Sequence, residues 1–106
     1  MAELIKVLLI EHETLTRIGI ETIFGGADDI ILAGRTDNAA DGFKLFSGSS
    51  PDVTILGLRF PDSCSIDDLD KYFSERPKAK IIVLADHAGD AEISRALKKG
   101  SLGYVC

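Results

Sequence analysis

Three short segments lie where chemically active side chains are expected, and each follows directly on an apolar run. Glu11-His12-Glu13 comes after residues 5–10, Gly57 after residues 53–56, and Ala85 after residues 80–84. Short apolar runs rich in β-branched residues are typical of buried strands in a parallel sheet. Sites in such sheets form beyond the carboxyl ends of the strands. A glutamate there is a ligand that Mg²⁺ takes, whereas a histidine is a poor one.

Strands and helices that would position these residues alternate along the chain. Apolar runs predict strands at residues 5–10, 30–33, 53–56, 80–84 and 102–105. The first helix is predicted by an apolar stripe at helical spacing, which we expect to face the sheet: Leu15, Ile18, Gly19, Thr22 and Ile23. A second helix follows residue 38. Ser65 and Asp68 resemble a capping box that opens a third helix. In a fourth helix, Ile93, Ala96 and Leu97 are expected to point inward, with Asp90 as its N-cap and Gly100 at its end.

Five strands alternating with four helices indicate an α/β fold with helices on both faces of a parallel sheet. At this size the expected architecture is a flavodoxin-like, doubly wound, five-stranded sheet in the order 2-1-3-4-5. A fifth helix, which would cover one face of the first and last strands, is absent from this chain. We therefore expect residues 1–106 to be one domain, the N-terminal part of a longer protein.

Composition excludes several classes of function. The 106 residues carry a formal net charge of -5, so the chain itself repels phosphate backbones and anionic membrane surfaces. The apolar run at residues 4–10 contains Lys6 and is too short for a signal peptide or a membrane span. The expected location is the cytoplasm, with no membrane partner and with nucleic acid bound only through another domain.

Four segments together resemble the receiver domains of bacterial response regulators, which are CheY-like. They are residues 5–13, 51–61 (PDVTILGLRFP), 81–87 (IIVLADH) and 99–104 (KGSLGY). Within that family, the chain resembles the subfamily usually joined to a helix-turn-helix output domain. The resemblance implies a two-component, phosphorelay signalling role and control of transcription through an output domain outside this chain.

The resemblance also shows what this chain lacks. A receiver uses an aspartate after the third strand as phosphoacceptor, and this position is Gly57. Of the two acidic residues that hold Mg²⁺, the first is Glu11 and the second is His12. The hydroxyl position after the fourth strand is Ala85, and the family's lysine would follow Cys106. We therefore expect no catalysis and no cofactor, with Glu11 at most able to touch a metal ion.

These residues predict an atypical receiver that is not phosphorylated at the usual position. It would act as a pseudo-receiver, an interaction or dimerisation module that presents its fourth helix and fifth strand to a protein partner or a second copy, with a sensor kinase as a further candidate partner. Tyr104 matches the family's switch aromatic. The alternative is a phosphorylatable receiver that uses Asp62 or Asp52 as a surrogate carboxylate with Mg²⁺. A flavodoxin-like flavin binder is disfavoured, because Glu11 and Glu13 place negative charge where a phosphate would bind.

Overall fold

A five-stranded parallel sheet forms the centre of the molecule. The computed structural model describes residues 4–61, 63–85 and 90–105, with the backbone alone for Asp90 and Tyr104. The sheet has the order β2-β1-β3-β6-β7, which confirms the predicted 2-1-3-4-5 arrangement. Its strands are β1 (Ile5–Ile10), β2 (Ile30–Thr36), β3 (Val53–Gly57), β6 (Ile81–Leu84) and β7 (Gly103–Val105).

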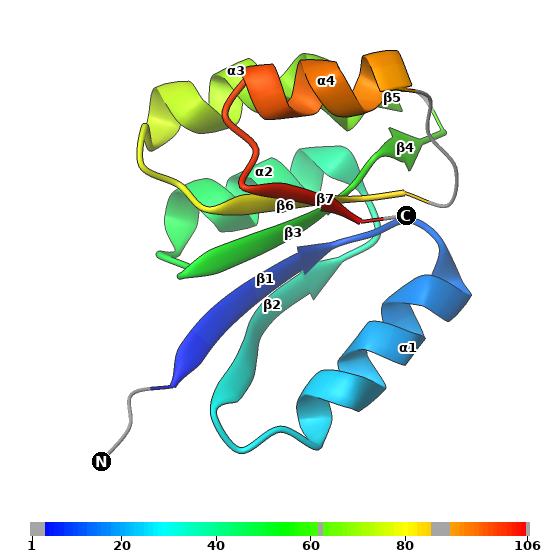
Figure 1. Cartoon of the computed structure of the whole chain (residues 1–106). Coiled ribbons are helices and arrows are strands. Elements are labelled where there is room, and N and C mark those ends of the chain that lie inside the picture. Colours follow the sequence, from blue (N-terminus) through cyan, green and yellow to red (C-terminus); the bar gives the residue numbers. More distant parts are fainter. Residues whose placement is uncertain (1–3, 62, 86–89, 106) are drawn as a thin grey trace.

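Helices cover both faces of this sheet, but unequally (Figure 1). On one face lie α2 (Ala39–Gly48), α3 (Ser65–Glu75) and α4 (Asp90–Lys98), whereas α1 (Thr14–Gly25) lies on the other. Within the described ranges, no helix combines the length and the apolar character that a membrane span requires.

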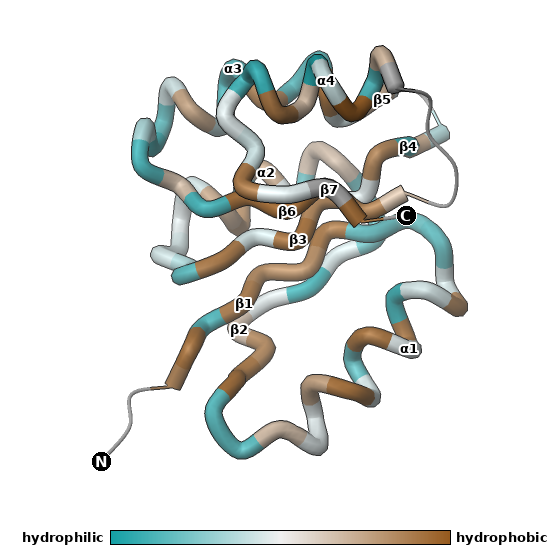
Figure 2. Tube along the Cα trace, in the orientation of Figure 1, coloured by the Kyte–Doolittle hydropathy of each residue, from teal (hydrophilic) through white to brown (hydrophobic). Residues whose placement is uncertain are grey.

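The main hydrophobic core lies between the sheet and the face that carries three helices. Leu8 and Ile10 of β1 pack there with Phe46 of α2 and with Leu69 and Tyr72 of α3, all at most 2% exposed. Figure 2 shows apolar residues running along β1 and β3, the two central strands. The last four residues of β1 are buried on both faces, which explains why that strand reads as a nearly unbroken apolar run in the sequence.

The predicted inner face of the first helix is wrong. Leu15 is 79% exposed and Ile23 is 70% exposed, and α1 instead turns the opposite side, with half-buried Ile20 and Phe24, toward the sheet. Its main contacts are to β2. In the described part of the chain no second helix lies on this face of the sheet (Figure 1). The apolar stripe therefore has no neighbouring helix to pack against.

Two further helix predictions need correction. Ser65 is the first residue of α3 and its side chain does not cap the helix, because its hydroxyl is bonded elsewhere. In α4, Ala96 is fully buried and Ile93 is half-buried, but Leu97 is 48% exposed and does not face inward. Asp90 begins α4 rather than preceding it as an N-cap.

A glycine ends the fourth helix, as the sequence predicted. Gly100 has a φ of 113° and lies two residues beyond α4, which confirms it as the helix stop.

The loop after β3 contains a two-stranded antiparallel ribbon that the sequence pattern did not predict. It consists of β4 (Arg59–Phe60) and β5 (Ser63–Cys64).

Candidate functional site

Strand register places the predicted site residues at one edge of the sheet. Ile10 of β1 pairs with Leu56 of β3, so that Glu11 follows beside Gly57. Gly57 in turn pairs with Leu84 of β6, and Ala85 follows it. The carboxyl ends of the three strands therefore meet where the open parallel sheet has its switch point.

Gly57 and the carboxylate of Glu11 share one small space. A Cβ atom on residue 57 would lie 3.0 Å from Cδ of Glu11 and 3.3 Å from the carbonyl oxygen of Ile10, and closer still to Glu11 Oε2. Glu11 itself is only 7% exposed. Its carboxylate thus lies where a side chain of residue 57 would begin.

The backbone of Glu11 is fixed on both sides. Its N–H donates to the carbonyl of Thr36 at the end of β2, at 3.1 Å. Its own carbonyl accepts a hydrogen bond from Nη1 of Arg17 in α1, at 3.3 Å. Glu11 therefore bridges the end of β1 to the neighbouring strand and to the first helix.

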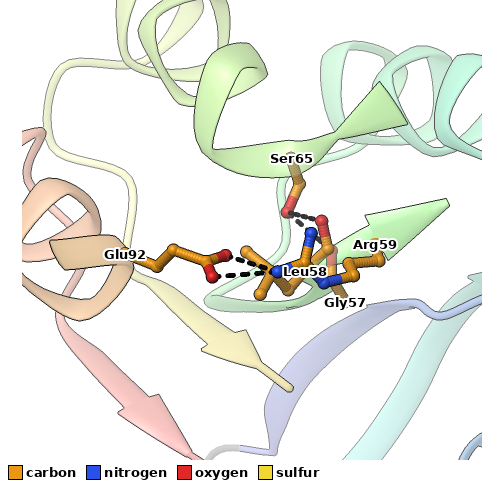
Figure 3. A network of polar contacts seen from close by, with 5 residues as sticks. All are labelled: Gly57, Leu58, Arg59, Ser65 and Glu92. Carbon is orange, nitrogen blue, oxygen red and sulfur yellow. Dashed lines mark hydrogen bonds and ion pairs between the residues drawn. The ribbon is translucent and has the colours of Figure 1, made fainter. Parts of the chain in front are cut away.

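The loop that leaves Gly57 is closed by Ser65 (Figure 3). The Ser65 hydroxyl donates to the carbonyl of Gly57 at 2.6 Å and lies 3.2 Å from that of Leu58, and the Ser65 N–H donates to Leu58 at 2.7 Å. Ser65 is 1% exposed, so these bonds are shielded from water. They fix the carbonyl side of residue 57 against the start of α3.

A charged pair joins the same loop to α4. Nη2 of Arg59 donates to both carboxylate oxygens of Glu92, at 2.9 and 2.8 Å (Figure 3). The Arg59 side chain is 61% exposed, so solvent screens this pair and its stabilisation is small. Neither Arg59 nor Ser65 was singled out from the sequence as a site residue. Their roles depend on contacts between segments that no local pattern reveals.

The hydroxyl position and the switch-aromatic position lie on adjacent strands. Ala85 is half-buried against the core, and its N–H donates to the carbonyl of Val105 at 2.8 Å. Tyr104 pairs with Val83 in the β6–β7 register. The structure describes only the backbone of Tyr104, so its predicted switching role remains a prediction.

His12 lies at a separate, open cleft. The cleft has a volume of about 440 Å³ and is lined by His12, Asp37, Asn38, Ala39, Phe60 and Pro61. The ring of His12 is exposed, and its centroid lies 6.5 Å from that of Phe60. Asn38 caps α2 by accepting a 2.8 Å hydrogen bond from the N–H of Asp41.

Of the two predicted surrogate acceptors, the structure describes Asp52 alone. Asp52 precedes β3 and accepts a 2.8 Å hydrogen bond from the N–H of Lys6. It therefore lies at the opposite edge of the sheet, about 16 Å from Gly57 at the usual rise of a strand. Asp52 is therefore distant from Gly57, and its use as a surrogate acceptor stays a prediction. Asp62 lies outside the described residues.

The residues at this edge do not fit the magnesium site that the resemblance implies. Mg²⁺ takes oxygen ligands in near-octahedral geometry, but Gly57 offers no side-chain oxygen and His12 offers an imidazole. Among the residues that the structure describes, no group of three or more His, Cys, Asp or Glu side chains could hold a metal ion. Among the described residues at this edge, Glu11 is the one that offers a buried carboxylate.

Comparison with known proteins gives a consistent result. No protein-family model matches the chain. The chain is 28% identical over 99 residues to the nitrate/nitrite response regulator protein NarL of Escherichia coli. The matched region covers 93% of this chain and 46% of NarL. The chain is 24% identical over 102 residues to the DNA-binding transcriptional activator DevR/DosR of Mycobacterium tuberculosis, covering 96% and 47%. The chain spans about half the length of the curated relatives it matches.

Solved structures agree on the fold. The signal receiver domain of a NarL response regulator from Mycobacterium tuberculosis superposes with a TM-score of 0.88 at 21% identity, covering 97% of this chain and 83% of that one. The isolated receiver domain of RcsB from Salmonella enterica, solved with the phosphomimetic BeF₃⁻, gives 0.87 at 18% identity, covering 97% and 77%. The homologues of this chain are thus response regulators such as NarL, and its fold is that of response-regulator receiver domains.

Proposed function

We propose that this chain is a regulatory receiver domain of a two-component response regulator that works without phosphoryl transfer at position 57. The observation that carries the proposal is the pair Gly57 and Glu11. Position 57 has no nucleophile, and a carboxylate oxygen of Glu11 lies where its side chain would start. Formation of an acyl phosphate needs a carboxylate oxygen on the acceptor, together with a cation to neutralise the phosphoryl charge.

The missing hydroxyl at Ala85 supports the same conclusion. Receivers switch when a new dianion biases a two-state surface, and a methyl group cannot bond to the oxygens of that dianion. The domain is therefore constitutive, or is controlled by a partner that binds it. We further propose that it acts in the cytoplasm and controls transcription through an output domain. The name of one relative, DevR/DosR, describes that protein as a DNA-binding transcriptional activator.

The surface made by α4 and β7 is the proposed contact face. Leu97 is 48% exposed and Leu102 is 63% exposed. Ile93, Ser94, Leu97 and Lys98 line an open hollow of about 500 Å³. Exposed apolar side chains next to such a hollow favour a protein partner or a second copy. Replacing Leu97 and Leu102 by lysine should abolish binding of the chain to its partner or to a second copy, measured by sedimentation velocity. The same replacement should leave the unfolding midpoint nearly unchanged.

The phosphorylation claim is tested with a small phosphodonor. The chain is incubated with acetyl phosphate and Mg²⁺, and its intact mass is measured, with the RcsB receiver domain as a positive control. We expect the control to gain one phosphate and this chain to gain none. A gain that disappears in Asp62→Asn would instead establish the surrogate carboxylate and overturn the proposal.

A further inference from the structure

We propose that Glu11 is the permanent internal occupant of the acceptor position, so that the pocket is filled by the protein's own side chain and is not open to another ligand. The inference rests on the proposed function above, in which residue 57 accepts no phosphoryl group. It assigns to Glu11 a space-filling role in place of a metal-binding one.

The first step is steric. Real Cβ atoms are essentially never found within 3.0 Å of another non-bonded heavy atom, and a Cβ on residue 57 would reach that limit at Glu11 Cδ and pass it at Oε2. Any side chain at position 57 therefore requires the Glu11 carboxylate to move. With Glu11 placed as it is, glycine is the one residue type that fits.

The second step concerns the freedom of Glu11 to move. Its backbone is bonded to Thr36 and Arg17, and the residue is 7% exposed. These hydrogen bonds hold the backbone of residue 11, and the burial of its side chain limits the positions that the carboxylate can take. Overpacking a site of this kind is destabilising unless the neighbour gives way.

The third step is the consequence for the site. An aspartate at position 57 would bring a second carboxylate into the volume that Glu11 already fills, which adds charge repulsion to the overlap. Restoring the acceptor would therefore require the Glu11 carboxylate to leave the place that it occupies here.

A double-mutant cycle on the 106-residue chain tests this coupling. Gly57→Ala, Glu11→Ala and the double variant are compared with the parent by urea unfolding. We expect Gly57→Ala to raise the unfolding equilibrium constant by about tenfold or more in the parent. In the Glu11→Ala background, the same change should shift it by no more than about threefold.

Gly42→Ala is the matched control. A Cβ there would lie 2.5 Å from Cγ2 of Ile10, so the clash does not involve Glu11, and Gly42→Ala should destabilise equally with and without Glu11. If Glu11→Ala does not fold, Glu11→Asp takes its place, because the shorter side chain withdraws the carboxylate. The proposal is also supported if the Gly57→Ala variant is unfolded while the double variant, which carries the change at residue 11 as well, is folded.

Two results would overturn it. An equal loss of stability from Gly57→Ala in both backgrounds would assign the clash to the Ile10 carbonyl. No loss in the parent would show that Glu11 moves aside freely. Either result leaves the proposed function intact, since Gly57 still lacks a nucleophile, whereas phosphate gain by the parent chain would refute that function without changing the cycle.

Discussion

The hydroxyl of Ser65 donates a 2.6 Å hydrogen bond to the carbonyl of Gly57, and both residues are buried. This bond joins the start of α3 to the end of β3 across an eight-residue separation in sequence. The loop after the acceptor position is therefore set by a serine that the sequence pattern assigned to helix capping.

Ser65→Ala should destabilise the chain by about 1–3 kcal/mol, because it leaves a buried carbonyl without its donor. Urea unfolding measures the change. Ser94→Ala is the matched control, since Ser94 is an exposed residue of α4, and it should change the free energy of unfolding by less than about 0.5 kcal/mol. Equal effects of the two substitutions would contradict a structural role for the Ser65 hydroxyl.

Arg76 should be equally hard to replace. Its guanidinium donates to three carbonyls at the end of α2, those of Phe46, Ser47 and Ser49, and lies 4.7 Å from the Phe46 ring centroid. A cation at a helix C-terminus is stabilising, and a planar fork can serve several acceptors at once. We expect Arg76→Ala to lose about 1–3 kcal/mol and Arg76→Lys to recover only part of it in urea unfolding.

Arg35→Lys is the control for this pair, because Arg35 makes an ion pair with Glu21 and its side chain is 64% exposed. That substitution should be close to neutral. Full recovery by Arg76→Lys would mean that charge alone matters at position 76.

Tyr72 should resist ionisation at alkaline pH. Burial, and secondarily the negative charge of Asp68, raise the pKa of the Tyr72 phenol well above its ordinary value. A raised pKa in the folded chain means that folding favours the neutral phenol. Its contribution to stability is thus complete below pH of about 10, the pKa of tyrosine in an unfolded chain, and declines as the pH rises further.

A Tyr104→Phe variant isolates this group, because the sequence contains two tyrosines. Tyrosinate absorbance and circular dichroism are followed together as the pH is raised. We expect the phenolate to form only as the helical signal is lost. Ionisation near pH 10 in a chain that is still folded would show that Tyr72 is accessible to water.

Truncation to alanine should destabilise the chain strongly at Leu69 and hardly at all at Leu15. Leu69 is fully buried, whereas Leu15 is 79% exposed. Leu69→Ala should lose about 2–5 kcal/mol by creating a cavity, and Leu15→Ala should stay within about 0.5 kcal/mol. Thermal or urea unfolding measures both. A large loss at Leu15 would mean that the exposed stripe of α1 is covered in solution.

Much of the fold could be predicted because the apolar runs are unambiguous. The run at residues 5–10 is β1, and the alternation of strands and helices led to the correct sheet order. The inner face of α1 could not be predicted in the same way. Its Leu15 stripe and its Ile20 side are both apolar, and the choice between them depends on which other elements lie beside the helix.

At the site, the sequence shows which residue types are present, but it does not show which of them are in contact. Gly57 and Ala85 show from sequence alone which functional groups are missing. That Glu11 fills the space beside Gly57 requires the β1–β3 register, in which Ile10 pairs with Leu56. A glycine facing a long acidic side chain one residue beyond that pair is a signal that register-based reasoning could have used.

The most direct test of a receiver without an acceptor at position 57 is titration of the chain with beryllofluoride and Mg²⁺, followed by ¹⁹F NMR. Beryllofluoride needs an acceptor oxygen to replace the phosphoryl group, and Gly57 has none. We predict only signals of free fluoride species, with the RcsB receiver domain giving a bound signal under the same conditions. Any bound signal from this chain would contradict the account, and its loss in Asp62→Asn would assign the acceptor to that residue.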